Sequence, residues 1–405
     1  MLHRHPHRHV VLAVGTVGQT GTCVFVYGLA SLVPRLRAEF GLTLGQTGAL
    51  VSTPVFGLLL TLVAWGFATD RFGERAVLAT GLAGSGAMLC LAPTVSSAVG
   101  LGAVLAVAGA FGASVNAASG RVVLGYYSAA GRGTAMGVRQ SAQPLGVALG
   151  AAVFPSLAGA VGVGRALLFP AAICLVAAAV IALGIPDPPP VAAAGTTASS
   201  GPGSSAGAVA GSASPYRDGL LARVHLASAL LVVPQFATAA FAVAYLVSER
   251  GWTDVGAGRL MAVVSLTGAG ARIVAGRWSD RIGSRLRPMR AVAVATAVAT
   301  AALTVGAATG WAPLALGALV VATVTAASPN GLAFTAVAER AGSAWAGRAL
   351  GVQNTGQNVT AVLVPPLLGA LVGATAFSAA FAVAAVAPVA AAALVPVSRE
   401  RTRPT

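Results

Sequence analysis

Two pairs of amide side chains recur in this sequence at one fixed separation. Asn116 is followed 214 positions later by Asn330, and Gln143 is followed 214 positions later by Gln357. Arg139 precedes Gln143 by four residues, so the two share one face if the segment is helical. Amides donate and accept hydrogen bonds, and a guanidinium binds anions, so these five side chains could together hold a polar or anionic molecule.

A second pattern concentrates charge in a chain that is otherwise almost uncharged. Residues 66–78 read GFATDRFGERAVL, and a weaker copy, GRWSDRIGSR, occupies 276–285, 210 positions after the first. A glycine inside each copy makes a tight turn sterically easy. The residues of this charged motif are Asp70, Arg71, Gly73 and Arg75 in the first copy, and Asp280, Arg281 and Gly283 in the second.

The composition identifies the medium in which these residues must be positioned. Of 405 residues, 56% are hydrophobic and 9% are charged, with a mean hydropathy of +0.83. An ordinary soluble globule is therefore excluded, and a membrane protein is indicated. The apolar runs are too long and too continuous for the strands of a barrel, so the fold class is all-α.

Twelve apolar runs are long enough to cross a bilayer, which takes about 20 residues. Six precede a long polar gap and six follow it. The predicted spans are 10–33, 46–68, 76–92, 98–121, 134–160, 165–185, 222–247, 256–276, 289–308, 311–335, 347–372 and 375–396.

The gap between the sixth and seventh runs predicts a division of the chain. It is rich in Pro, Gly, Ser and Ala, which is typical of a flexible linker. We therefore predict an N-terminal six-helix half at 1–185, a linker at 186–221 and a C-terminal six-helix half at 222–405. The repeats indicate that the halves are pseudo-symmetric copies of one unit.

Arginine positions predict the topology. All 25 basic residues are Arg, and 18 of them fall on one side of the membrane if the chain starts on that side. The positive-inside rule then places both termini in the cytoplasm. We expect a multi-pass protein of the plasma (inner) membrane, functioning as a monomer.

The order of six spans, linker and six spans, together with the motif at 66–78, resembles the major facilitator superfamily over essentially the whole chain. The resemblance implies a secondary transporter that works by alternating access. It also implies that Asp70 faces the start of a helix near Gly347, and Asp280 the start of another near Gly133. Both contacts would stabilise the outward-open state, because a carboxylate is favoured at a helix N-terminus.

The same resemblance implies that the first, fourth, seventh and tenth spans line a central cavity. Gln19 lies in the first span and recurs 216 positions later as Gln235 in the seventh. We therefore add both to the candidate substrate-binding residues Asn116, Asn330, Arg139, Gln143 and Gln357. The alternative is that these polar side chains join neighbouring helices, which is also common in membranes. Arg272 and Arg121 are interpreted as part of the cytoplasmic charge belt.

The acidic residues constrain the substrate. All ten fall in predicted loops, the linker or helix ends, so no span has a carboxylate in its middle. A cationic substrate is disfavoured, and a small polar or anionic solute is favoured. Leu105 stands where related proton-coupled pumps carry an arginine, so a proton remains an uncertain coupling ion. Residues 131–155 are loosely similar to importers of cyanate and other small polar solutes.

Other function classes find little support. With His225 the only histidine beyond the HRHPHRH segment at 3–9, no catalytic triad or catalytic metal cluster can be assembled, and we expect no enzyme activity, no cofactor and no metal site. Metal binding by the HRHPHRH segment stays an alternative to a basic tail near anionic lipid. The basic residues do not gather on a soluble domain, so nucleic acid is not an expected partner. Two alternatives stay open: an efflux transporter for a hydrophobic or antibiotic-like compound, and a non-transporting membrane receptor or sensor with the same fold.

Overall fold

The structure is a computed structural model in which every regular element of the described residues is helical. It describes residues 8–126, 132–184, 214–342 and 345–400, with side chains described throughout these ranges except at 8–11, 14, 70, 117–126, 132–135 and 346.

The helices fall into two groups on either side of the predicted linker. The first group is α1 (Arg8–Val26), η1 (Gly28–Leu32), α2 (Val33–Phe40), α3 (Leu44–Phe72), α4 (Glu74–Leu89), η2 (Ala92–Thr94), α5 (Ala98–Tyr126), α6 (Arg132–Gln140), α7 (Ala142–Val161), α8 (Val163–Ala166) and α9 (Leu168–Gly184). The second is α10 (Leu220–Arg250), α11 (Asp254–Ile282), α12 (Leu286–Thr309), α13 (Ala312–Ala327), α14 (Asn330–Ala341), α15 (Ala346–Ala374), α16 (Phe377–Leu394) and η3 (Val397–Arg399).

Within the described residues, twelve helical segments of 19 to 31 residues are long and apolar enough to cross a membrane. Each overlaps one of the twelve predicted spans, although their bounds differ, and the predicted fold class is confirmed. Large apolar side chains such as Leu60, Val99 and Leu183 are exposed on their outer faces. Such faces suit contact with lipid, while the helices satisfy their own backbone hydrogen bonds.

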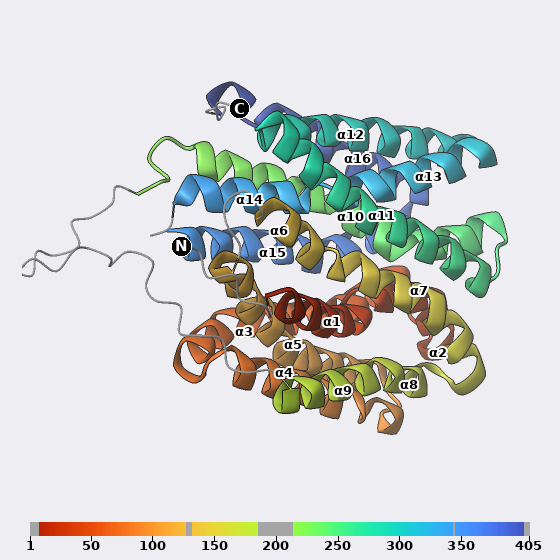
Figure 1. Ribbon diagram of the computed structural model, residues 1–405. Helices are drawn as coiled ribbons and strands as arrows, with labels where there is room; N and C mark the ends of the chain where they lie inside the picture. The colour runs from red at the N-terminus through yellow and green to blue at the C-terminus, as the bar shows by residue number, and fades with distance from the viewer. Residues whose placement is uncertain (1–7, 127–131, 185–213, 343–344, 401–405) are drawn as a thin grey trace, which may run out of the picture.

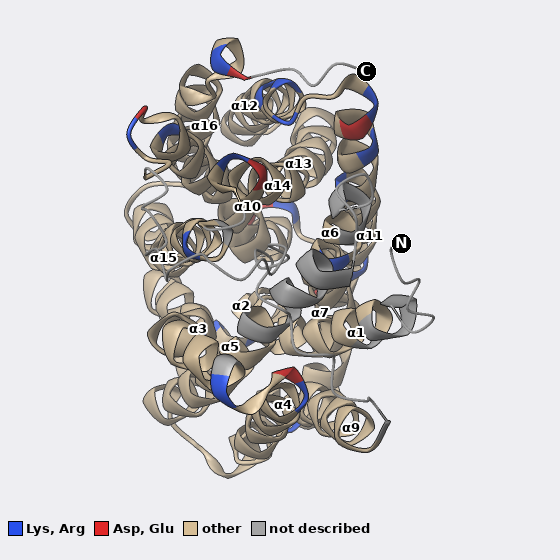
Figure 2. Ribbon diagram, turned by 60° about the vertical axis from the view of Figure 1, so that its left-hand side comes forward, with Lys and Arg blue, Asp and Glu red and all other residues tan. Residues whose placement is uncertain are grey.

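Figure 1 shows α1–α9, coloured red to yellow-green, packed beside α10–α16, coloured green to blue. Most of the predicted linker, residues 186–213, lies outside the described residues, and α10 begins at Leu220, two positions before the predicted boundary. Charged residues gather at the helix ends and in the connections, leaving long uncharged stretches between them (Figure 2). The boundaries of the three predicted domains stay a prediction.

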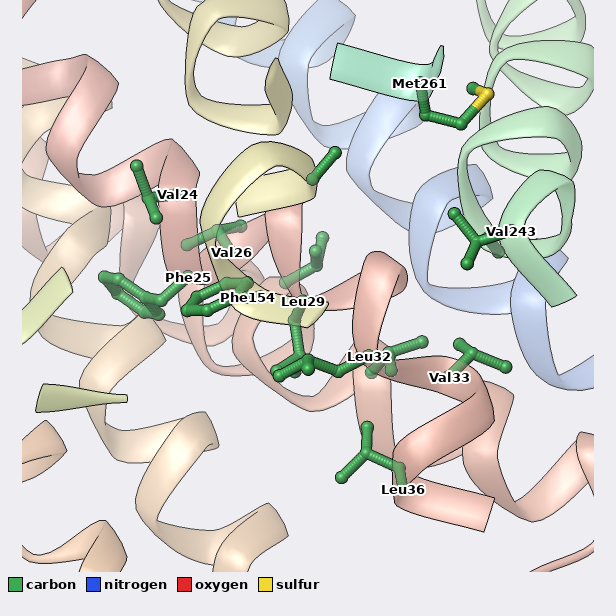
Figure 3. Packing of buried hydrophobic residues seen from close by; sticks show 14 of the residues in the cluster. Val24, Phe25, Val26, Leu29, Leu32, Val33, Leu36, Phe154, Val243 and Met261 are labelled. Atoms are coloured by element: carbon green, nitrogen blue, oxygen red, sulfur yellow. The ribbon is translucent and has the colours of Figure 1, made fainter. Parts of the chain in front are cut away.

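The two ends of the bundle differ in how the groups of helices meet. We call the distal end the one opposite the start of α1; it is formed by residues 27–43, 90–97, 162–167, 251–253, 310–311 and 375–376. Near it, one apolar cluster joins Leu29 and Phe154 of the first group to Val243 and Met261 of the second (Figure 3). A second apolar cluster, near the other end, draws its buried residues from positions 220–395 alone, within the stretch of chain that forms the second group. The two groups are thus joined by apolar packing toward the distal end.

Small residues allow that close approach. A Cβ atom on Gly48 of α3 would lie 2.4 Å from the carbonyl oxygen of Pro365 in α15. Likewise, a Cβ on Gly258 of α11 would lie 2.4 Å from the carbonyl oxygen of Ala151 in α7. Only glycine permits backbones to approach this closely, as in other membrane helix pairs. The groups are therefore in direct backbone contact along α3 with α15 and α7 with α11.

An ion pair also crosses between the groups at the distal end. Nε of Arg35 lies 2.8 Å from a carboxylate oxygen of Asp254, the first residue of α11. The acidic group at this position also meets the positive end of the helix macrodipole. The pair is partly open to solvent, since 41% of the Arg35 side chain is exposed, so it contributes modestly.

Candidate functional site

One cavity between the two groups of helices collects most of the predicted binding residues. It has about 570 Å³ of free space and is lined from both groups. Six of the seven candidate substrate-binding residues line it: Gln19, Asn116, Arg139, Gln143, Asn330 and Gln357. Gln235 lines two adjoining cavities instead. Their role as substrate ligands stays a prediction, but the structure brings them together.

The two repeats place equivalent amides in equivalent contacts. Nε2 of Gln19 donates a hydrogen bond to Oδ1 of Asn116 over 3.2 Å. In the second repeat, Nδ2 of Asn330 donates to Oε1 of Gln235 over 3.2 Å. Gln235 therefore belongs to the same polar assembly through Asn330, although it does not line the same cavity.

Gln19 keeps one polar atom unused. Its Oε1 is buried and has no hydrogen-bond partner in the described part of the chain. A buried acceptor without a donor is costly, so it marks a place where a hydroxyl or N–H group of a bound molecule would be favoured.

A break in the fifth span sets the position of Arg139. Helix α6 ends at Gln140 and α7 begins at Ala142, because Pro144 has no N–H to offer the carbonyl of Gln140 four residues earlier. Arg139, in the last turn of α6, is 7% exposed. Its Nη2 donates to the backbone oxygen of Asn116 over 3.4 Å, which holds the guanidinium beside α5.

Arg272 corrects the interpretation given from the sequence. It does not join a solvated charge belt, since it is 1% exposed and lines the cavity that adjoins the one around Arg139. The eighth span was predicted to end at 276, but α11 continues to Ile282. Arg272 therefore lies ten residues from the end of its helix, or about 15 Å at about 1.5 Å per residue.

The second group contributes a chain of side-chain hydrogen bonds that starts at the cavity. Nε2 of Gln357 donates to Oδ1 of Asn330 over 3.2 Å and to the hydroxyl of Ser228 over 2.7 Å. The amide of Gln353 also donates to Ser228, and its Oε1 lies 2.6 Å from Nδ1 of His225. Sequence reasoning missed Ser228, Gln353 and His225 as parts of the site. The four-residue step from Gln353 to Gln357 was the available signal, because it places both on one helix face.

The first copy of the charged motif lies where α3 turns into α4. Arg71 is in the last turn of α3, exposed, with its guanidinium 5.5 Å from the ring centroid of Phe72. Gly73 follows with a φ of 81°, a conformation that L side chains rarely adopt. Arg75 donates to the backbone oxygen of Ala182 in α9. The side chain of Asp70 lies outside the described residues.

The second copy is engaged within its own half. Asp280 forms an ion pair with Arg285, which also binds Glu339 of α14. Burial alone would lower the pKa of Arg285, but its hydrogen bonds to Glu339 and Asp280 and the charges of both raise it, so the guanidinium stays charged. Arg281 is exposed, and Gly283 ends α11 in the left-handed conformation. The predicted partner of Asp280, near Gly133, falls among side chains that are not described.

A junction beside this motif ties the start of α10 to the end of α14. Asp218 accepts a hydrogen bond from the N–H of Leu220 over 3.1 Å and forms an ion pair with Arg340. The hydrogen bond from the Leu220 N–H is the largest cause of the lowered pKa of Asp218. Desolvation opposes it, while the hydrogen bond and the charge of Arg340 lower the pKa further. Elsewhere in the described residues, no group of three or more His, Cys, Asp or Glu side chains could hold a metal ion.

Comparison with known proteins identifies relatives of this arrangement. The chain matches the family model of the Major Facilitator Superfamily over residues 16–365 and 226–405. It is 41% identical over 391 residues to an uncharacterized MFS-type transporter of Mycobacterium tuberculosis strain H37Rv, covering 96% of this chain and 85% of that protein. A protein of strain CDC 1551 with the same description matches at the same identity and coverage.

Solved structures share the fold at low sequence identity. A bacterial homologue of the human lysosomal transporter Spinster, in an inward-facing and occupied conformation, superposes with a TM-score of 0.73 at 15% identity, with 97% of each chain covered. The human organic anion transporter MFSD10 gives a TM-score of 0.72 at 17% identity, covering 96% of this chain and 99% of that one. The nucleoside transporter NupG gives 0.70 at 15% identity, covering 96% of this chain and all of that one.

Proposed function

The chain belongs to the Major Facilitator Superfamily of multi-pass membrane transporters, which are not enzymes, and we propose that it moves a small polar or anionic solute by alternating access. The observation that carries this proposal is the cavity around Arg139, whose lining includes five further predicted amides. A cavity that meets both groups of helices can open to either side when the groups rock against each other.

The electrostatics of the cavity favour an anion over a cation. Arg139 lines it, Arg272 lines the cavity beside it, and no acidic residue is found in the described lining of either. The amides supply further donors and acceptors that would hold a polar group. A guanidinium in a cavity of low dielectric attracts an anion more strongly than it would in water.

We place both termini in the cytoplasm, on the strength of the arginine distribution. The distal end then faces outward, and the backbone contacts of α3 with α15 and of α7 with α11 close that side. The charged motif would act at the opposite side as the gating set: Asp70, Arg71, Gly73, Arg75, Asp280, Arg281 and Gly283. Asp70 and Asp280 would bind across the halves when the outer side opens.

A second candidate function has one observation in its favour. Most of the other residues that line the adjoining cavity of Arg272, including Val243, Met261 and Val264, are apolar. Such a cavity would also accommodate a hydrophobic compound, as an efflux transporter requires.

Uptake measurements separate the two. Cells that express the intact protein, Arg139→Ala or Arg259→Ala are given labelled small anions, labelled neutral metabolites and a lipophilic cationic dye. Arg259 is an exposed arginine of α11 and serves as the matched control. We expect anion uptake that Arg139→Ala abolishes and Arg259→Ala leaves unchanged. Expulsion of the dye without any anion uptake would instead support the efflux function and remove Arg139 as a ligand.

A further inference from the structure

The proposed function uses Arg272 only as a positive charge near the cavity around Arg139, but its contacts are more specific than that. Its guanidinium donates three hydrogen bonds, and they reach both groups of helices. Nε donates to the backbone oxygen of Ala327 over 2.6 Å, Nη1 to the backbone oxygen of Gln140, and Nη2 to Oε1 of Gln143 over 3.0 Å. A single side chain of α11 thus joins α13 of its own group to the break between α6 and α7.

The two carbonyls are available because both helices are interrupted. Pro144 leaves the oxygen of Gln140 without an intrahelical donor. Ala327 is the last residue of α13, where carbonyl groups also lack intrahelical partners. These acceptors satisfy three of the five N–H groups of the guanidinium, but they carry no formal charge.

The charge of Arg272 is therefore not neutralised by the contacts that hold it. No acidic residue lines its cavity, and the ten acidic residues of the chain lie outside the middle of the described spans. A buried cation is unfavourable unless an anion compensates it, and in membrane proteins such residues mark binding sites. The missing negative charge is one that a bound ligand could supply.

Gln143 connects this cation to the cavity around Arg139. Gln143 and Tyr27 line both cavities, so the two spaces meet at these side chains. A ligand anion beside Gln143 could replace its Oε1 as the acceptor of the Nη2 group of Arg272. One guanidinium would then come from each half of the protein, with the orphan acceptor Oε1 of Gln19 on the same cavity wall.

We propose that Arg272 is a second anion-binding residue. The solute is then an anion with acceptor oxygens that contact both Arg139 and Arg272, and it also carries a hydroxyl group. This inference rests on the proposed function and narrows its substrate class. Two carboxylates or one phosphate would supply the acceptor oxygens, since each offers several to planar guanidinium donors. The hydroxyl would donate to Gln19. Binding such an anion draws the two halves together, because each half contributes one cation.

Binding to the purified full-length protein in detergent tests the proposal. The probes are malate, with two carboxylates and a hydroxyl; glycerol phosphate, with a phosphate and hydroxyls; succinate, with two carboxylates alone; and lactate, with one carboxylate and a hydroxyl. The variants are Arg272→Gln, Arg272→Lys and, as a matched control, Arg277→Gln, an exposed arginine on the same helix. Elution of each variant as a single folded species is checked first.

We expect the intact protein to bind malate or glycerol phosphate more tightly than lactate, and malate more tightly than succinate. Arg272→Gln should weaken the binding of the preferred anion by about tenfold to hundredfold, which is the range for losing a charge-assisted hydrogen bond. Lactate binding should change little, because Arg139 alone can hold one carboxylate. Arg272→Lys should give an intermediate affinity, and Arg277→Gln should match the intact protein. Preference for malate or for glycerol phosphate tells which acceptor chemistry the site uses.

Two outcomes would overturn the assignment. If Arg272→Gln weakens the binding of all four probes by the same factor, Arg272 only stabilises the helices that it joins and does not contact the anion. If lactate binds as tightly as malate and glycerol phosphate, the site holds one acceptor group. Either result leaves the proposed function intact when Arg139-dependent anion uptake persists, whereas loss of that uptake removes the proposed function as well.

Discussion

Closure of the distal end can be tested at Gly48, where α3 meets α15. Replacing Gly48 by alanine adds a Cβ atom that would lie 2.4 Å from the carbonyl oxygen of Pro365 and 2.6 Å from its carbonyl carbon. Both atoms belong to the backbone, so no side chain can rotate to make room. The two helices must separate, and separation at this point opens the distal side.

The size of the effect follows from the cost of overpacking. Inserting a methyl group into a well-packed contact costs about 1–3 kcal/mol. The strain acts when the distal side is closed and is relieved when it is open. In the proposed orientation, with the distal end facing outward, the equilibrium should shift toward the outward-open state. At about 1.4 kcal/mol per factor of ten, the shift is about 5-fold to 140-fold.

A cysteine inside the cavity reports this equilibrium. Ala239 of α10 lines both cavities nearest the distal contacts, and Ala239→Cys would react with a membrane-impermeant maleimide from outside only when that side opens. The background should lack the native cysteines Cys23, Cys90 and Cys174. Gly66→Ala is the matched control, because a Cβ on Gly66 of the same helix would meet nothing within 4 Å.

We expect Gly48→Ala to raise the labelling rate by the calculated factor, up to saturation, and Gly66→Ala to leave it unchanged. Equal rates in the two variants would refute the reasoning, since they would mean that contact between α3 and α15 does not control access from outside. Slower labelling in Gly48→Ala would show that the added methyl group favours the closed state.

Three smaller predictions concern other contacts of the structure. Arg35→Gln removes the partly exposed ion pair with Asp254, so it should raise the labelling rate of Ala239→Cys by no more than about 5-fold, equivalent to about 1 kcal/mol. A larger increase would show that solvent does not screen this ion pair. Tyr245→Phe removes the oxygen that accepts two hydrogen bonds from Arg250, at 2.8 and 2.6 Å. It should destabilise the protein by about 1.5–3 kcal/mol, measured by thermal unfolding. An unchanged unfolding temperature would show that these two hydrogen bonds do not stabilise the protein. Folding lowers the pKa of Asp218, so its carboxylate stabilises the protein above the unfolded pKa, and this stabilisation is lost as the pH falls through the folded pKa. Asp218→Asn should therefore reduce the dependence of unfolding stability on pH in the acid range. If the stability of the variant and of the intact protein depends on pH in the same way, the Asp218 carboxylate does not stabilise the fold.

The sequence itself was sufficient for the architecture and for much of the candidate site. Long apolar runs admit only helices in a bilayer, because the backbone must satisfy its own hydrogen bonds there. The repeat then selected residues such as Asn116, Asn330 and Gln357, because equivalent positions of duplicated halves face the same axis. The structure brings these side chains to one cavity. The repeat, together with the cavity-lining spans that the family resemblance implies, was enough to predict that outcome.

The position of Arg272 required the tertiary structure. The apolar run around it ends at 276, but α11 continues through polar residues to Ile282, so the distance from Arg272 to the end of its helix was underestimated. Its three acceptors come from Gln140, Gln143 and Ala327, at sequence separations of 55 to 132 residues. No local pattern reports such contacts.

The pairing of side chains across helices was likewise decided by packing. The sequence placed Gln19 and Asn116 in spans that could face each other, but the hydrogen bond between them depends on the rotation of α1 against α5. The helix break at Pro144 could be predicted from the local sequence. The guanidinium that donates to the carbonyl oxygen of Gln140 at this break comes from Arg272, in the other half. Composition and periodicity determine which segments become helices in the membrane, because those requirements are local. Which polar groups meet is decided only when the two halves pack, because hydrogen bonds and charges act over a few ångströms between residues far apart in the chain.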